Sequence, residues 1–210
     1  MGRMRRPLHR GTGGDRAGTL ESAAGGRLMV EMPDLTPEYF EILTVRELRK
    51  IGLEVSELRV QRRAALPEPE RGYLLELKGV LSRPPWRRHV LIGCRRQEVA
   101  VRRADVESFK GHFREFGADA GILFATAPYE PDALAAAQDG AVVLLRVTDG
   151  RTAFDTSGWG TPGHYPGWLP AYCAQVVGRD VSGQLCYQLL ESGQGDVIVD
   201  QIRAPEERKG

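Results

Sequence analysis

Ala120-Gly-Ile-Leu-Phe-Ala-Thr126 is an apolar run without a charged residue, and a second apolar run, Ala141-Val-Val-Leu-Leu-Arg-Val147, follows it. Continuous apolar runs of this length are typical of strands that are buried on both faces of a sheet. Between the two runs, residues 131–138 form an alanine-rich segment that the chain enters through Pro128 and Pro131, which favours a helix. The order strand, helix, strand predicts a parallel β-α-β unit at the centre of the fold.

The residues before this unit predict a hairpin and a helix. Tyr73-Leu-Leu-Glu-Leu-Lys-Gly-Val80 and His89-Val-Leu-Ile-Gly-Cys-Arg-Arg96 have the composition of two strands, and a Pro-Pro turn joins them. Residues 103–117 then place four apolar side chains, three of them phenylalanine, on one helical face, with Gly117 at the stop.

The first periodic segment predicts a further helix and strand. Asp34 or Thr36 can cap this helix, apolar residues recur at helical spacing after Pro37, and Gly52 ends the pattern. A strand with an irregular step is expected over residues 53–60. The resulting order, α-β-β-β-α-β-α-β, predicts an α/β fold with a central mixed β-sheet flanked by helices on both faces.

Composition divides the chain into three parts. Residues 1–33 are rich in arginine and poor in large apolar residues, which predicts a flexible basic tail that is either merely solvated or touches phosphates. Residues 34–150 carry the α/β pattern. Residues 151–210 form a C-terminal extension, in which an irregular Gly- and Trp-rich loop at 158–170 precedes strands around 174–177 and 185–190 and an apolar stretch at 196–202.

The overall charge limits the classes of partner. The net charge is +1 and the sequence pI about 7.8, so a nucleic acid would have to meet a local basic patch. Cysteine occurs three times without C-x-x-C spacing, which argues against a disulfide framework and fits the reducing cytoplasm. No apolar stretch approaches the roughly 18 residues of a membrane span, and the basic start lacks the apolar segment of a secretory signal.

The span 39–150 resembles the Mrr-type restriction endonuclease domain of the PD-(D/E)XK nuclease superfamily. The matching pieces stand in the family's order: an opening helix and its exit, a strand that in the family ends in Gln-Cys-Lys-Arg, a strand that ends in Thr, an alanine-rich helix, and a closing Asp-Gly. In this chain they are Phe40-Glu41-Ile42-Leu43 with Gly52-Leu53-Glu54-Val55, His89-Val-Leu-Ile-Gly-Cys-Arg-Arg96, Ala118-Asp119-Ala120-Gly121-Ile122-Leu123-Phe124-Ala125-Thr126, Pro131-Asp132-Ala133, and Leu144 to Gly150.

The resemblance implies Mg²⁺-dependent cleavage of DNA, in which acidic residues and a Gln or Glu hold the metal and a Lys polarises the attacking water. The family's Gln and Lys positions are occupied here by Gly93 and Arg95. Glycine has no side-chain oxygen for a metal, and arginine can clamp a phosphate but cannot act as a base. The resemblance therefore predicts a degenerate active site, in which cleavage is impaired or lost.

Two glutamates are candidates for what remains of this site. Glu76 is the carboxylate on the strand that should carry the metal-binding acid, which makes it the candidate metal ligand, although its alternation with Leu75 and Leu77 also allows a solvent-facing position. Glu41 matches a family acid near the site, or is simply a charge on a solvated helix face. With Arg95, these residues are the candidate catalytic set, and Mg²⁺ is the expected cofactor if the site is active.

A run of arginines surrounds the candidate site and suggests double-stranded DNA as a partner. Phosphate contacts from such residues would make binding salt-dependent. The alternative is a set of arginines paired with nearby carboxylates, such as Glu98, Asp105 and Glu107, on a solvated hairpin. The candidate DNA-binding residues are Arg83, Arg87, Arg88, Arg96, Arg102 and Arg103.

The remaining reactive side chains have simpler interpretations. His112 is expected on a helix surface. Cys94 is expected to be a small buried residue on its strand, because the sequence shows no histidine and base that could activate it as a nucleophile. Trp159, Tyr165 and Trp168 either cover the core or form a surface for another protein.

Two classes of function follow. The first, which the resemblance implies, is a cytoplasmic, DNA-binding, metal-dependent endonuclease domain of bacterial defence, either intact or with cleavage impaired or lost. The second is a non-catalytic protein-interaction or scaffold module that reuses the nuclease fold in a bacterial assembly, with a second copy or another protein as partner.

Overall fold

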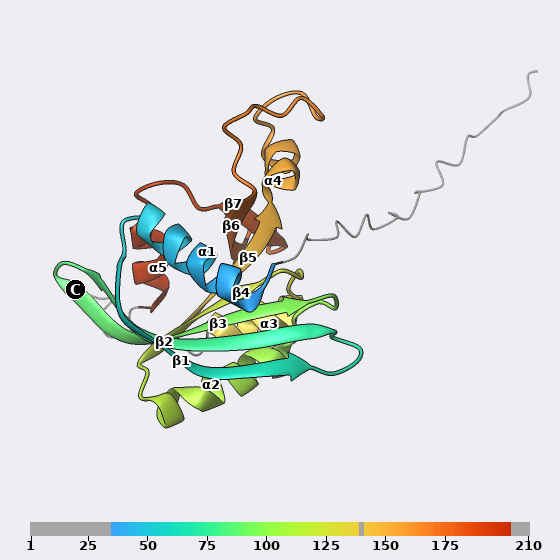
Figure 1. The fold of residues 1–210 in the computed structure, drawn as a ribbon. Helices are drawn as coiled ribbons and strands as arrows, with labels where there is room; N and C mark the ends of the chain where they lie inside the picture. Colours follow the sequence, from blue (N-terminus) through green and yellow to red (C-terminus); the bar gives the residue numbers. More distant parts are fainter. Residues whose placement is uncertain (1–34, 139–140, 203–210) are drawn as a thin grey trace, which may run out of the picture. The chain divides into compact units, whose positions relative to one another are not determined.

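The computed structural model describes residues 35–138 and 141–202, and the predicted basic tail, 1–33, lies outside these residues. Within the described part, the chain forms a single seven-stranded sheet whose strands lie side by side in chain order (Figure 1). The strands are β1 (Glu54–Leu66), β2 (Gly72–Arg83), β3 (Trp86–Gln97), β4 (Ala120–Ala125), β5 (Val142–Asp149), β6 (Tyr172–Arg179) and β7 (Leu185–Leu189).

The sheet is mixed, as the sequence predicts. Strands β1, β2 and β3 pair in antiparallel fashion, β3, β4 and β5 pair in parallel, and β5, β6 and β7 are antiparallel again. The predicted hairpin is the β2–β3 pair, and the predicted β-α-β unit runs from β4 to β5. Strands β6 and β7 continue the same sheet beyond residue 150.

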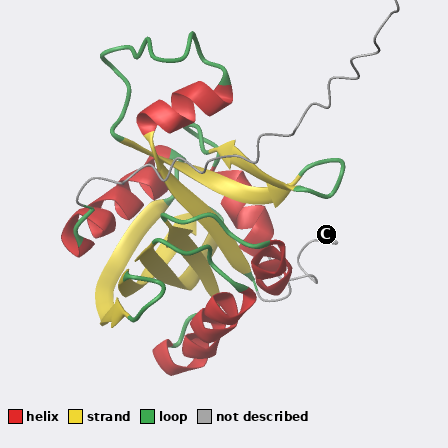
Figure 2. Cartoon of the chain, turned by 90° about the vertical axis from the view of Figure 1, so that its right-hand side faces the viewer, coloured by secondary structure: helices red, strands yellow, loops and turns green. Residues whose placement is uncertain are grey.

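Helices lie on both faces of this sheet (Figures 1 and 2). One face packs against α1 and α5, and the other packs against α2 and α3. The fourth helix, α4, packs against β5 and β6. None of the described helices is long and apolar enough to cross a membrane. The helices are α1 (Pro37–Lys50), α2 (Arg103–Phe116), α3 (Pro131–Gln138), α4 (Gly150–Ser157) and α5 (Gly195–Ile202).

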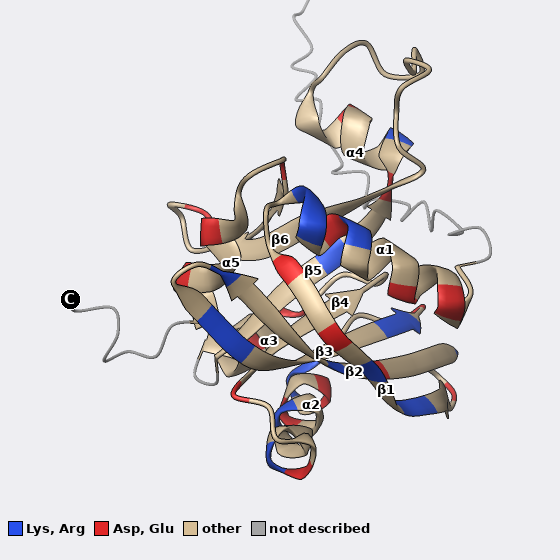
Figure 3. Cartoon of the chain, turned by 60° about the vertical axis from the view of Figure 1, so that its left-hand side comes forward, with Lys and Arg blue, Asp and Glu red and all other residues tan. Residues whose placement is uncertain are grey.

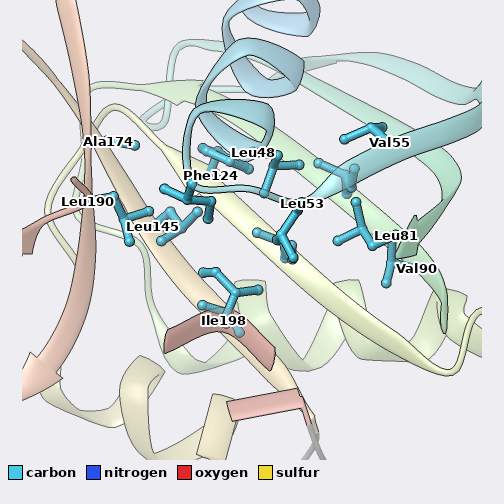
Figure 4. Packing of buried hydrophobic residues seen from close by; sticks show 14 of the residues in the cluster. Leu48, Leu53, Val55, Leu81, Val90, Phe124, Leu145, Ala174, Leu190 and Ile198 are labelled. Atoms are coloured by element: carbon cyan, nitrogen blue, oxygen red, sulfur yellow. The ribbon is translucent and has the colours of Figure 1, made fainter. Parts of the chain in front are cut away.

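Two apolar layers, one on each face, form the core. Figure 4 shows part of the layer under α1 and α5, to which Leu48 and Ile198 contribute from the two helices and Phe124 from β4. On β3, Ile92 belongs to this layer and Leu91 to the layer under α2, because successive side chains of a strand point to opposite faces. This alternation decides which face each candidate site residue joins.

Local sequence signals account for the predicted helices. The Thr36 hydroxyl accepts a hydrogen bond from the Tyr39 backbone N–H at 3.2 Å, which caps α1 as expected. Gly117 has a φ of +61° at the end of α2, a backbone conformation that glycine adopts without steric cost.

The structure departs from the sequence pattern in three places. The first strand reaches Leu66, well beyond residue 60. Helix α4 was not expected, because Asp149-Gly150 suggests a turn; instead, the Asp149 side chain accepts a hydrogen bond from Thr152 N at 2.9 Å and starts a helix. Residues 195–202 are rich in β-branched residues, yet they form helix α5, because Ile198, Val199 and Ile202 together bury an apolar face against the sheet.

Candidate functional site

Gly93 lies at the centre of the candidate site, on the face of β3 that α2 covers. It pairs in register with Glu76 of β2 on one side and with Leu123 of β4 on the other. A Cβ atom at this position would lie 2.7 Å from Leu123 Cδ1 and 2.9 Å from Phe109 Cε2. Neighbouring apolar side chains therefore fill the space into which a glutamine at position 93 would have to project.

Glu76 is buried rather than solvent-facing, since its relative exposure is 0%. The leucines on either side of it face the α1 layer, while Glu76 points to the α2 side. Its Oε1 lies 2.8 Å from His112 Nδ1, and its Oε2 has no hydrogen-bond partner among the described residues. A buried carboxylate is costly unless it is paired, so His112 is what makes this position tolerable for Glu76.

His112 is therefore not the plain surface residue that its helix pattern suggests. Its side chain is 19% exposed, and its Nε2 lies 3.2 Å from Arg62 Nη1. Arginine can only donate, so Nε2 must accept and the ring proton must sit on Nδ1, from which it is donated to Glu76. The three residues form one hydrogen-bonded chain that leads from the buried carboxylate to the exposed edge strand β1.

The Arg95 guanidinium is hydrogen-bonded to two other side chains. It is 6% exposed, its Nε donates to Gln97 Oε1 at 2.7 Å, and its Nη2 donates to Asp105 Oδ1 at 3.0 Å. Asp105 also accepts a hydrogen bond from the Arg102 backbone N–H at the start of α2. Arg95 thus ties β3 to α2, and its charge is neutralised by a buried carboxylate.

The structure does not bring the three predicted catalytic residues into one cluster. Glu76 and Arg95 point to the same face of the sheet, because Glu76 lies directly opposite Gly93, and Gly93 is two residues from Arg95 along β3. Glu41 belongs to α1, which covers the opposite face, and it lies 4.0 Å from Arg63 Nη2.

Most of the predicted DNA-binding arginines are paired with carboxylates. Arg83 contacts Asp196 at 3.0 Å, and Arg88 also has an interaction partner. Arg96 is partly buried, and its Nε has no hydrogen-bond partner among the described residues. The other ion pairs are Arg87–Glu57, Arg102–Glu70 and Arg103–Glu107. The paired-arginine alternative thus describes much of this set, and its contact with DNA stays a prediction.

Sequence reasoning did not single out three residues at this site. Arg62 and His112 are fifty positions apart in the chain, and no spacing rule connects them. Asp105 was considered only as a counter-charge, whereas it is the buried partner of Arg95. The one available signal for His112 is its place on the helix that follows the candidate strand, because that helix packs over the site.

The seven-stranded mixed sheet, covered by helices on both faces, defines an α/β domain of the restriction-endonuclease-like class. Comparison with protein families gives the same result from sequence: the restriction endonuclease family defined by the Mrr catalytic domain matches residues 32–150. The chain belongs to this family. No curated protein and no solved structure matches the chain in the corresponding searches.

The family implies a Mg²⁺ ion, but the residues present do not fit one. Mg²⁺ takes oxygen ligands in near-octahedral geometry, usually including one or two carboxylates. Glu76 and Asp105 are already engaged by His112 and Arg95, and Gly93 contributes no side chain. Within residues 35–138 and 141–202, no three His, Cys, Asp or Glu side chains are grouped to hold a metal.

Proposed function

We propose that this protein binds double-stranded DNA with a restriction-endonuclease-like domain that has lost metal-dependent phosphodiester cleavage. The proposal places it in the cytoplasm, in bacterial defence against foreign DNA. Family membership supports DNA as the ligand, and the free thiols of the described cysteines, Cys94, Cys173 and Cys186, fit a reducing compartment.

The packing around Gly93 is the observation that carries the loss of cleavage. Phe109 and Leu123 occupy the space next to this position, so a metal-binding side chain has no room there. At the same time Arg95 is held by Asp105, and Glu76 is held by His112. Metal, nucleophile and phosphate positioning act as one unit in phosphoryl transfer, so these changes together should remove most of the rate.

DNA binding does not need this chemistry, because phosphate contacts alone supply most of the affinity for non-specific DNA. Arg87 and Arg103 are more than half exposed, as their side-chain exposures are 64% and 60%. Exposed ion pairs contribute little free energy, so their carboxylates can be exchanged for phosphates at small cost. Arg87 and Arg103 therefore remain available to a duplex despite their partners.

Two assays test the proposal. In the first, supercoiled plasmid is incubated with the protein in Mg²⁺ or Mn²⁺; in the second, retention of a DNA duplex is measured across a salt series. We expect salt-dependent retention and no nicking, by either the native chain or Glu76→Ala. Glu68→Ala, at an exposed glutamate, is the matched control. Metal-dependent nicking that disappears in Glu76→Ala would contradict the proposal, and nicking that persists in it would place cleavage elsewhere and contradict it equally.

A protein-interaction module is the second candidate, and the loop after α4 favours it. Trp168 is 69% exposed and Trp159 is 40% exposed. Large aromatic residues at this exposure are typical of contact surfaces. Measurement of molar mass in solution for the native chain and Trp168→Ala tests the case of a homo-oligomer. A native dimer that the substitution dissociates would favour this candidate; an unchanged monomer would count against a homo-oligomer held by this loop.

A further inference from the structure

Three cations, Arg59, Arg62 and Lys78, lie on one face of strands β1 and β2, beside α2, and we call them the β1–β2 basic strip. Figure 3 marks the basic and acidic positions along the ribbon of the domain. Arg59 pairs in register with Lys78, and Arg62 pairs with Glu76. Residues directly opposite each other on neighbouring strands point to the same face. Since positions 76 and 78 of β2 also share a face, all three cations project to the side that carries α2.

A bulge in β1 brings the two arginines onto the same face. Residues three positions apart in a regular strand point to opposite faces, because side chains alternate. The register of β1 shifts between Val60 and Arg62, so that Gln61 has no partner of its own on β2. This extra residue rotates Arg62 to the side of Arg59. An irregular step in the strand therefore has a specific result, which is a local concentration of positive charge.

The strip differs from neighbouring arginines in its charge balance. Arg63, the next residue along β1, points to the other face, where Glu38 Oε1 lies 2.6 Å from its Nη1. Within the described residues, neither Arg59 nor Lys78 has a carboxylate within ion-pair distance. Glu76, the register partner of Arg62, is fully buried and faces His112. Exposed positive charge without a counter-charge favours a polyanionic ligand.

The buried Glu76–His112 pair orients one member of the strip. His112 Nε2 accepts a hydrogen bond from Arg62 Nη1 at 3.2 Å, and Glu76 fixes the ring through Nδ1. This contact restricts the rotamers of an otherwise exposed side chain and leaves its remaining N–H groups free. A guanidinium held in this way can donate two parallel hydrogen bonds to a phosphate with less loss of entropy on binding.

We propose that the β1–β2 basic strip is the primary phosphate-binding surface of the domain, and that His112 and Glu76 are positioning residues for Arg62. This inference rests on the proposed function, because it specifies where the duplex sits. The glutamate on the candidate catalytic strand then serves to hold an arginine against phosphate, and the ion-paired arginines of β3 and α2 contribute less.

The salt dependence of binding to a 20-base-pair duplex tests the location. Each lost phosphate contact lowers the slope of log affinity against log salt by about 0.9. We therefore expect Arg59→Gln/Arg62→Gln/Lys78→Gln to lower the slope by about 2 to 3. The control, Arg63→Gln/Arg71→Gln/Arg179→Gln, removes the same charge from exposed arginines that belong neither to the strip nor to the predicted DNA-binding set, and should lower it by less than about 1.

The outcomes separate this inference from the proposed function. If the native chain binds the duplex and both triple variants lose the same slope, or only the control loses it, the strip is not the phosphate surface, although DNA binding stands. If the native chain does not bind the duplex at any salt concentration, both the proposed function and the strip are wrong. Thermal unfolding of each variant shows whether the fold is retained. The single variants Arg59→Gln and Lys78→Gln, at unpaired side chains, test the salt slope without the loss of a hydrogen bond.

A double-mutant cycle tests the positioning role of His112. His112→Phe keeps a ring in place but removes the acceptor for Arg62. We expect it to weaken duplex binding several-fold in the native background and to have no further effect in Arg62→Gln. Equal effects in both backgrounds would show that His112 acts only on the stability of the fold, and would overturn this part of the inference.

Discussion

Gly93 of β3 lies directly opposite Glu76 of β2, and the Glu76 carboxylate pairs with His112 of α2. The packing at Gly93 and the partner of Glu76 both come from the α2 side of the sheet. Phe109 and Leu123 fill the space on the α2 side of Gly93, and the carboxylate that remains is satisfied from the same helix.

Packing at Gly93 should make even a small side chain destabilising. We expect Gly93→Ala to lower the free energy of unfolding by about 1 to 3 kcal/mol, since its Cβ would overlap buried neighbours. Gly111→Ala, in α2, is the control: a Cβ there meets nothing within 4 Å, and alanine should raise stability by about 0.5 to 1 kcal/mol. Urea unfolding measures both, and a neutral Gly93→Ala would mean that the space beside β3 is open.

Arg95 should be a structural residue whose loss leaves Asp105 buried without a counter-charge. We expect Arg95→Met to cost about 3 to 5 kcal/mol of unfolding free energy, and the further change Asp105→Asn to recover part of it. Arg103→Met, at an exposed ion pair, should cost less than about 1 kcal/mol. A small effect of Arg95→Met on the free energy of unfolding would contradict this structural role.

Cys94 should make the fold sensitive to alkali. Burial raises the pKa of its thiol from the ordinary value of 9.0 to about 12, against a weaker opposing effect of the hydrogen bond with Thr44. A raised pKa in the folded state means that its contribution to stability is complete below about pH 9 and is lost as the pH rises toward 12.

The corresponding measurement is unfolding free energy between pH 8 and pH 11, expressed relative to pH 8. We expect Cys94→Ala to flatten this decline, because it removes a group that ionises more readily in the unfolded chain. Cys186→Ala, at a partly exposed cysteine, serves as the comparison. Identical pH profiles for the native chain and Cys94→Ala would exclude Cys94 as a cause of alkaline destabilisation.

Much of the fold can be predicted from the sequence because its strongest signals are local. The apolar run that starts at Ala120 is buried along β4, and the helix stop at Gly117 lies where the pattern indicates. Helices α4 and α5 could not be predicted in this way. Asp149 caps a helix at a place where Asp-Gly suggests a turn, and α5 becomes helical because its buried face meets the sheet.

The candidate site is less predictable, because it depends on register and on contacts between distant residues. The leucines that flank Glu76 suggest a half-exposed strand, yet helices cover both faces of β2, so the glutamate is buried. The bulge at Gln61 and the contact of Arg62 with His112 leave no signal in the residue pattern. The glycine at position 93, in contrast, can be seen in the sequence itself once the resemblance to the family's motif is recognised.

Binding of Mn²⁺, measured by calorimetry on the native chain and on Glu76→Gln, tests most directly the proposal that the domain has no metal site. We expect neither protein to bind a stoichiometric ion at millimolar concentrations, because the carboxylates beside Gly93 and Arg95 are engaged by other side chains. One Mn²⁺ bound per native chain, and abolished by Glu76→Gln, would contradict the central claim.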